Sequence, residues 1–238
     1  MANQILFTPN DNNLGTVSNK VMVGKNFTGD LASFNGKVFV IDLENLPYIP
    51  TYGSMNFGGK TYQTVIYPTQ EWTTENLDYS DNTIPIKTFS TIDYDNPAAY
   101  YINDNQNYAK LHKYGLFYNS RCISHINSLL SNGWHIPTPQ EYQILVDFVG
   151  ENNTYKIKST SDWNTSNTNE YGLNIVPAGW LDGTESYKFE HEQARFLCDG
   201  ANEGDTNTFC FFDNNETTPG HMLNNYYSFS IRLVRNLT

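Results

Sequence analysis

The sequence predicts an α+β protein, with a small β-rich segment at residues 1–50 and a second domain at residues 51–238. The second domain is expected to hold two helices, short antiparallel strands and long loops. Segments in which polar and apolar residues alternate, as in strands, come first and last, while helical periodicity is confined to the middle of the chain. Aromatic residues make up 15% of the chain, including 17 Tyr and 14 Phe, which favours strands. A length of 238 residues suits one large domain plus a small extension.

Residues 1–50 are expected to form a compact set of about three strands. Their apolar runs, at residues 4–9, 19–24 and 36–43, are short and bounded by Gly, Asn and Lys. A segment of this size buries little surface alone, so it would pack on the main domain, pair with a second copy or dock on a larger assembly. Residues 46–54 contain two prolines and are predicted to be a linker.

Two strands are predicted next, at residues 60–67 and 71–79, with a turn around Pro68 between them. Residues 81–115 are polar and rich in turn formers, so they are predicted to be an irregular insertion between strands and helices. Irregular stretches of that length are uncommon, and they are usually functional or ordered against a neighbour.

The first helix is predicted within residues 119–133, with Asn119 or Ser120 as its cap. Its apolar face is expected to consist of Ile123, Ile126, Leu129 and Leu130.

The second helix has the clearest boundaries. Thr138 is the predicted N-cap, Pro139 occupies the first helical position, Glu141 completes a capping box and Gly150 ends the helix. Its apolar stripe is Tyr142, Leu145, Val146 and Val149. Just before it, Trp134 and Ile136 are expected to fill the core.

Short strands and long loops are predicted after residue 155, ending in a strand at residues 226–236. In that strand Phe229, Ile231 and Leu233 alternate with a second set, Ser230, Arg232 and Val234. The first and last strands of the domain are expected to pair.

The formal net charge is −11, and the 14 Lys and Arg residues are scattered. Phosphate binding needs clustered basic residues, so neither a nucleic acid nor an anionic membrane is an expected partner. No apolar run is long enough to span a membrane. The first residues lack the features of an export signal, so we expect the chain to stay in the cytoplasm or to leave it inside an assembly such as a virion.

The cysteines are Cys122, Cys198 and Cys210. Three is an odd number and no C-x-x-C spacing occurs, so neither a disulfide framework nor a zinc site is predicted. Free, buried thiols are expected, although Cys198 and Cys210 could pair if the fold brought them together.

No catalytic residue is predicted. His135, beside Trp134, has no nucleophile motif to serve and is interpreted as structural. Glu71, Glu75 and Asp78 could suggest the paired carboxylates of a glycosidase, but hydrogen bonding at turns and strand ends is favoured.

The acidic loops at residues 198–207 and 212–220 offer oxygen ligands for calcium, but neither has EF-hand spacing. We therefore predict no cofactor and no metal, with calcium as the alternative.

Six blocks in order resemble the Fibrobacter succinogenes major paralogous domain from about residue 58 to the C-terminus. They are Trp72 with Glu75, Asn76 and Leu77; Tyr114, Gly115 and Tyr118; Gly133, Trp134 and Pro137; Lys158 to Thr160 with Trp163; Tyr171, Gly172, Pro177, Ala178 and Gly179; and Ser230 to Arg235. The resemblance implies a fold similar to C-type lectins and to the formylglycine-generating enzyme. Family members tend to be surface or binding proteins. The calcium-binding tripeptides of sugar-binding C-type lectins do not occur in this sequence.

Most members look like exported surface proteins, whereas this chain shows no export signal and carries an unmatched N-terminal extension. That combination resembles phage virion proteins, including the head fibres of crAss-like phages of gut Bacteroides. We therefore expect a non-enzymatic head or tail fibre or decoration protein in the virion, anchored to other capsid proteins by residues 1–50 and forming homo-oligomers. Its C-type-lectin-like head would bind a host-surface glycan or protein.

The alternatives are a bacterial adhesin-like surface protein and, least favoured, an oxidase like the formylglycine-generating enzyme. That enzyme needs a cysteine pair, and the residues around Cys198 and Cys210 do not match its motif. The predicted ligand-binding residues precede the last strand, where Asn, Tyr and His suit adaptable polar contacts. They are Asn214, Asn215, His221, Asn224, Asn225, Tyr226 and Tyr227.

Overall fold

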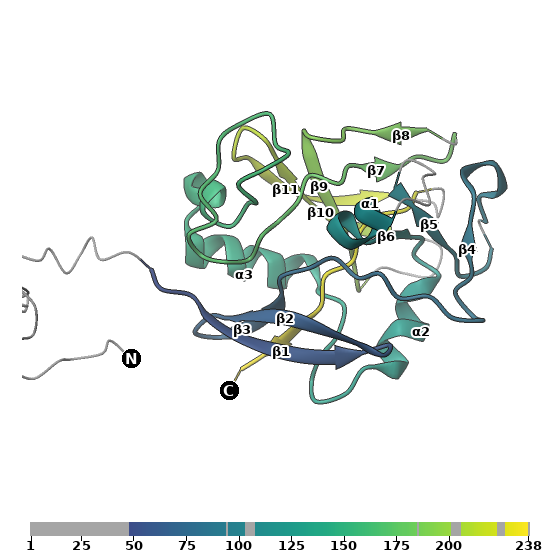
Figure 1. Cartoon of the computed structure of the whole chain (residues 1–238), viewed down its shortest axis with the longest axis horizontal. Helices are drawn as coiled ribbons and strands as arrows, with labels where there is room; N and C mark the ends of the chain where they lie inside the picture. Colours follow the sequence, from purple (N-terminus) through teal and green to yellow (C-terminus); the bar gives the residue numbers. More distant parts are fainter. Residues whose placement is uncertain are drawn as a thin grey trace, which may run out of the picture. The chain divides into compact units, whose positions relative to one another are not determined.

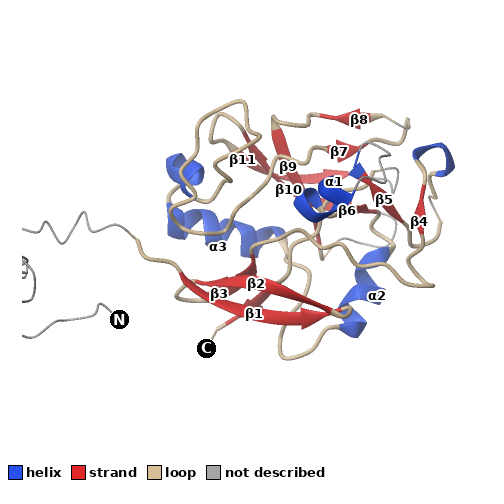
Figure 2. Cartoon of the chain, viewed as in Figure 1, coloured by secondary structure: helices blue, strands red, loops and turns tan. Residues whose placement is uncertain are grey.

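The computed structural model of the chain describes residues 48–93, 95–102, 108–184, 186–200, 206–222 and 227–237. Residues 48–238 form one compact unit. The strands predicted in residues 1–47 lie outside the described residues. A few helices accompany several small, mostly antiparallel sheets (Figures 1 and 2), which confirms the α+β class.

The first sheet has the strand order β1 (Thr51–Phe57), β2 (Lys60–Ile66), β3 (Gln70–Thr73) and β12 (Val234–Asn236). Every neighbouring pair is antiparallel. The last strand therefore enters the sheet of the first strand, but it pairs with β3, so the expected pairing of first and last strands was wrong. The supposed linker was also partly wrong, because β1 begins at Thr51 and forms one edge of the sheet.

The second sheet has the order β11 (Thr217–Met222), β10 (Thr206–Phe212) and β9 (Gln193–Cys198). Bridges from Ser230 to Phe196 and from Phe229 to Tyr118 connect it to β6 (Leu116–Tyr118). Beyond β6 lie β5 (Ala99–Tyr101) and β4 (Ile86–Lys87). A small hairpin, β7 (Trp180–Leu181) and β8 (Tyr187–Lys188), lies alongside and is joined to β9 by a bridge from Gly179 to Ala194.

The described part of the chain contains three α-helices, one more than predicted. They are α1 (Tyr108–Tyr114), α2 (Cys122–Leu129) and α3 (Pro139–Val149), and short 3₁₀ helices η1 (Phe89–Thr91) and η3 (Glu151–Lys156) accompany them. The additional helix, α1, lies in the stretch predicted to be irregular, which also contains β4 and β5. Seven residues are too few to give a clear helical period.

The predicted boundaries of α3 are confirmed. The Thr138 side chain accepts a hydrogen bond from the Glu141 backbone, the reciprocal bond completes the capping box, and Gly150 ends the helix. The predicted cap of α2 was wrong. Arg121 occupies the N-cap position, and its side chain does not cap the helix, while the Asn119 side chain bonds to the backbone of Asp93, Asn96 and Ala98. Asn119 therefore fastens the preceding loop instead of the helix.

The core lies on both faces of the second sheet. On one face, the Tyr142 ring of α3 packs against Phe196 and Phe209, with ring centroids 5.5 and 5.1 Å apart. On the other face, Leu197 and the fully buried Ile126 of α2 belong to one hydrophobic cluster. Adjacent strand residues point to opposite faces, so α2 and α3 cover opposite sides of β9.

The described residues 227–236 do not form the single strand that the alternation predicted for residues 226–236. Phe229, Ile231 and Leu233 are buried as expected, but Ser230, Arg232 and Val234 are buried too. The segment passes through the core from the second sheet to the first, so both of its sides are covered. Trp134 and Ile136 are also buried, which confirms that they fill the core.

Candidate binding surface

Three of the predicted ligand-binding residues, Asn214, Asn215 and His221, lie on the hairpin formed by β10 and β11. Asn224, Asn225 and Tyr226 lie outside the described residues. Asn214 and Asn215 form the turn between β10 and β11, whereas His221 pairs with Asn207 near the other end of β11. Six extended residues span about 20 Å. The turn and His221 therefore do not share one site.

Asn215 is tied to the scaffold. Its backbone oxygen accepts a hydrogen bond from Thr154 Oγ1 at 2.9 Å, and its Oδ1 accepts one from Lys158 Nζ at 3.2 Å. Lys158 also donates to the Phe212 carbonyl and is fully buried, and burial lowers the pKa of its ammonium to about 8. These contacts fix the hairpin tip, so the Asn215 amide oxygen is already occupied.

Tyr227 belongs to a different group of side chains, centred on Trp180 of β7. The Trp180 ring lies 5.5 Å from the Tyr227 ring, edge to face, and 6.2 Å from the Phe189 ring, stacked. The Arg195 guanidinium of β9 lies 5.4 Å from the Trp180 ring centroid. Phe189 is 44% exposed, and the other three side chains are partly exposed. We call Trp180, Phe189, Arg195 and Tyr227 the Trp180 surface.

Two polar atoms of this surface lack partners. Trp180 Nε1 and Arg195 Nε are buried, and neither has a hydrogen-bond partner among the described residues. The nearby β10 residue Thr208 has an unpartnered hydroxyl as well. Buried donors without partners are rare and costly in folded proteins. A ligand or an ordered water would supply the missing acceptors.

The segment that carries Phe189 is held in an unusual conformation. Phe189 has φ 59° and His191 has φ 72°, a region that side chains other than glycine rarely adopt. Gly179 explains the position of the segment, because a Cβ there would lie 2.1 Å from the Lys188 carbonyl oxygen. Backbone strain of this kind tends to persist where the surrounding structure or a function requires it.

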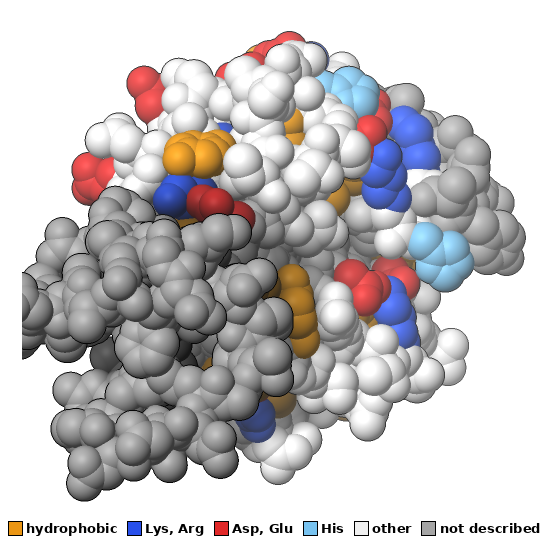
Figure 3. Space-filling model, turned by 60° about the vertical axis from the view of Figure 1, so that its left-hand side comes forward, with side chains coloured by type: hydrophobic (Ala, Val, Ile, Leu, Met, Phe, Trp, Pro, Cys, Tyr) orange, Lys and Arg blue, Asp and Glu red, His pale blue; other side chains and the backbone are white. Residues whose placement is uncertain are grey.

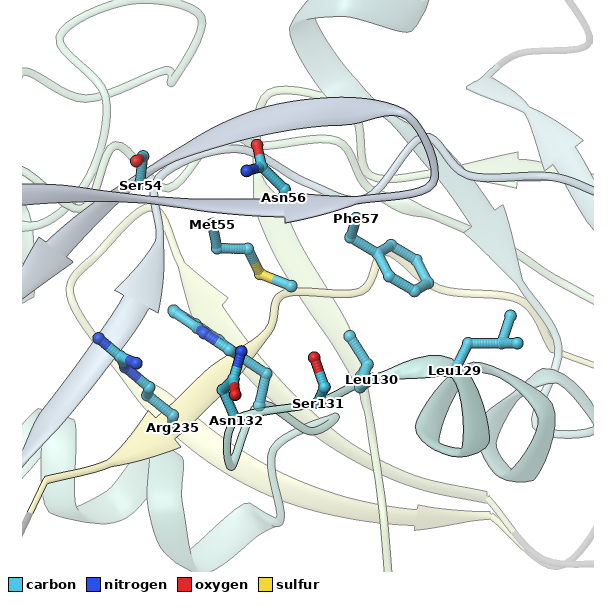
Figure 4. Close-up of a pocket in the computed structure, with 10 residues that line it drawn as sticks. Ser54, Met55, Asn56, Phe57, Leu129, Leu130, Ser131, Asn132 and Arg235 are labelled. Carbon is cyan, nitrogen blue, oxygen red and sulfur yellow. The ribbon is translucent and has the colours of Figure 1, made fainter.

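A separate hollow of about 250 Å³ lies between β1 and the end of α2 (Figure 4). Met55 and Phe57 point from the strand toward the segment that carries Leu130. Arg235, on the opposite wall, is paired with Glu71 at 2.5 Å and lies over the Trp134 ring. Arg235 is the one charged residue that lines this hollow, and Glu71 already neutralises it. The hollow therefore offers fewer unpaired groups for ligand recognition than the Trp180 surface.

The candidates that the sequence analysis interpreted as structural have structural contacts. His135 Nε2 lies 2.7 Å from Glu141 Oε1, and its Nδ1 lies 2.9 Å from the Gly133 carbonyl oxygen. Glu75 and Asp78 both pair with Lys60 at 2.9 Å. Among the described residues, no group of three or more His, Cys, Asp or Glu side chains is arranged to hold a metal ion.

The three thiols are free and buried, as predicted. Cys198 lies opposite Asn207 in the β9–β10 ladder, and Cys210 lies opposite Arg195. Residues 207 and 210 are an odd number of positions apart, so the two thiols point to opposite faces of the sheet. Burial raises the pKa of both thiols, which disfavours the reactive thiolate.

Trp180, Phe189 and Arg195 were not among the binding residues predicted from the sequence. One signal could have identified Arg195, since it is the single charged residue in the otherwise apolar strand sequence "ARFLC". No local pattern marks Phe189, because its exposure follows from a tertiary contact with Gly179.

Fold and surface together define an α+β domain with an aromatic surface beside one end of its second sheet. The chain belongs to the Fibrobacter succinogenes major domain family, whose model matches residues 65–235. Neither the curated proteins nor the solved structures gave a significant match. No described helix has both the length and the apolar character needed to cross a bilayer. Acidic and basic side chains of described residues are interspersed on the face shown in Figure 3.

Proposed function

We propose that the chain is a non-enzymatic recognition protein whose C-type-lectin-like head binds a host-surface ligand, a glycan or a protein, through the Trp180 surface. The observation that carries this proposal is the packing of two aromatic rings and one guanidinium around Trp180, with two buried donors unpartnered among the described residues. Aromatic side chains and arginine dominate the energetics of binding surfaces.

The contacts of the titratable groups support a binding role over a catalytic one. His135 and Glu141 close the start of α3, and the thiols are buried on different faces of the sheet. An oxidase that works through Cys198 and Cys210 would need the two thiols on one face. Recognition needs no such group, only an exposed and preorganised surface.

The sequence features favour a virion setting, in which residues 1–50 attach the head to the particle or to further copies. Many weakly binding heads on one particle would then act by avidity. A bacterial adhesin-like protein would use the same surface, so the setting needs its own test. Mass spectrometry of purified phage particles gives that test, and absence of the chain from them would exclude the virion role.

Binding itself is tested with Phe189→Ala and Trp180→Ala, assayed against gut Bacteroides cells and a glycan array. We expect at least tenfold weaker binding for both variants, with folding checked by circular dichroism. Phe148→Ala is the matched control, because Phe148 is 37% exposed and lies on α3, outside the Trp180 surface. Equal binding by all three variants would refute the assignment of this surface.

A further inference from the structure

A second hollow, of about 400 Å³, lies beside α1. Its walls are Lys110, Lys113, Tyr114, Asp162, Glu190 and His191. We call it the α1 pocket. Its size lies within the range of small-molecule sites, but its lining is mostly polar and charged, unlike the apolar pockets that most drug-sized ligands fill.

The charges of the α1 pocket are balanced. Lys110 Nζ lies 3.0 Å from Glu190 Oε1, and Lys113 Nζ lies 2.5 Å from Asp162 Oδ2. An anion would have to compete with two carboxylates for the lysines. A cation would have to compete with the two lysines for the carboxylates. The pocket therefore disfavours phosphate, organic acids and polyamines, and it favours a ligand without net charge.

Tyr114 and His191 provide hydrogen-bonding capacity that the fold leaves unused. Tyr114 is only 3% exposed, but it lines the pocket and its hydroxyl is not among the fully buried atoms that lack partners. The hydroxyl therefore reaches the hollow, where a ligand can contact it. His191 Nδ1 lies 2.6 Å from the Asp162 carbonyl oxygen, which requires the proton on Nδ1 and leaves Nε2 without such a partner in the described structure.

We propose that the α1 pocket binds one residue of a neutral saccharide. Its walls carry both donors and acceptors, since ammonium groups and the phenol donate while carboxylates and the imidazole Nε2 accept. A sugar hydroxyl both donates and accepts, so it can bridge a lysine and its carboxylate without breaking their ion pair. A hexose ring also fits a hollow of about 400 Å³.

The α1 pocket is distinct from the Trp180 surface, although one segment contributes to both. Phe189 stacks on Trp180, while Glu190 and His191 line the pocket. The pocket could thus hold a terminal sugar residue independently of whether the aromatic surface binds host cells. The proposal does not depend on a virion setting.

The test is a titration of the full chain with neutral glycosides, in which isothermal titration calorimetry and ligand-observed NMR measure binding. The glycosides are methyl glucoside, methyl galactoside, methyl mannoside and methyl N-acetylglucosaminide. We expect saturable binding of at least one glycoside, with a dissociation constant on the order of millimolar. Raising the salt concentration should leave the affinity unchanged, because the ligand is neutral. Sodium phosphate and spermidine should bind more weakly than the sugar.

Tyr114→Phe removes only the hydroxyl that reaches the hollow, so it should fold like the wild type and bind the sugar at least fivefold more weakly. Tyr67→Phe is the matched control, because Tyr67 is equally buried but its hydroxyl donates to the Tyr171 carbonyl. The proposal is overturned if no neutral glycoside binds, if Tyr114→Phe binds as well as the wild type, or if phosphate or spermidine binds more tightly. Phe189→Ala should keep glycoside binding even where it loses cell binding, which separates this proposal from the function assigned to the Trp180 surface.

Discussion

Arg232 Nε donates a hydrogen bond of 2.6 Å to Asn76 Oδ1, across 156 positions of the chain. The other guanidinium nitrogens donate to the carbonyl oxygens of Thr73, Leu173 and Asn174. Arg232 is buried, and burial lowers the pKa of its guanidinium to about 10. All four hydrogen-bond acceptors are neutral, so the buried charge is stabilised by oriented dipoles instead of by an ion pair in direct contact.

Asn76→Ala is expected to lower the free energy of unfolding by about 3 kcal/mol or more, because it leaves part of a buried cation unsatisfied. Urea unfolding measures the loss. Asn152→Ala, at an exposed position of η3, should change stability by less than about 0.5 kcal/mol. Equal effects of the two substitutions would show that the Arg232 network is not a principal source of stability.

The Arg232 network and the Trp180 surface differ in how far the sequence could predict them. Asn76 and Arg232 belong to two of the six family blocks, and both act in the core; the blocks predicted the family, whereas the order of strand-like and helical segments predicted the α+β class. The Trp180 surface depends instead on one close contact between Gly179 and the backbone around Lys188. Such a contact leaves no periodicity and no local composition in the sequence, so Phe189 could not be predicted, whereas the lone charge of Arg195 in an apolar strand was a usable signal.

The pair formed by His135 and Glu141 is expected to make stability depend on pH. The hydrogen bond to Glu141 raises the pKa of His135 above 6.5, against the effect of burial. Burial opposes ionisation of Glu141, but hydrogen bonds from His135, Thr138 and Asn236 together lower its pKa to about 2. Ionised Glu141 therefore stabilises the fold above about pH 4.5, and this stabilisation is lost as the pH falls toward 2. Protonated His135 stabilises the fold below about pH 6.5, and this stabilisation is lost as the pH rises.

His135→Ala should accordingly destabilise the protein more at pH 5.5 than at pH 8.5, as measured by urea unfolding at both values. The His135 side chain is 31% exposed, so solvent screening should keep the difference below about 1 kcal/mol. His112→Ala removes an exposed histidine of α1 and should show no such difference. The same pH dependence in both variants would point to general charge effects instead of the pair.

The three thiols should be unreactive in the folded protein. Burial raises the pKa of Cys122 to about 12 and raises the pKa values of Cys198 and Cys210. We expect DTNB to react with the thiols only when urea unfolds the chain, because the thiolate is the reactive form. The double variant Cys198→Ala with Cys210→Ala should keep its ligand binding. A fast-reacting thiol in the native state, or a disulfide between these two residues, would revive the oxidase hypothesis.

Gly179 provides the sharpest test of how the Trp180 surface is built. Gly179 and Gly59 both have positive φ, 68° and 79°, so an alanine at either position is strained by roughly 1 to 2 kcal/mol. A Cβ at Gly59 meets no atom within 4 Å, whereas a Cβ at Gly179 meets the backbone of Lys188, Phe189 and Glu190.

Gly179→Ala should therefore destabilise the protein by more than Gly59→Ala, and the excess measures the cost of moving the segment that carries Phe189. Urea unfolding gives this excess, and a near-ultraviolet circular dichroism spectrum reports whether the packing around Trp180 changes. Because Phe189, Glu190 and His191 would move together, Gly179→Ala should also weaken both cell binding and glycoside binding, while Gly59→Ala leaves both intact. Equal stability of the two alanine variants would mean that the segment can move at no cost, and that Gly179 does not determine the position of either site.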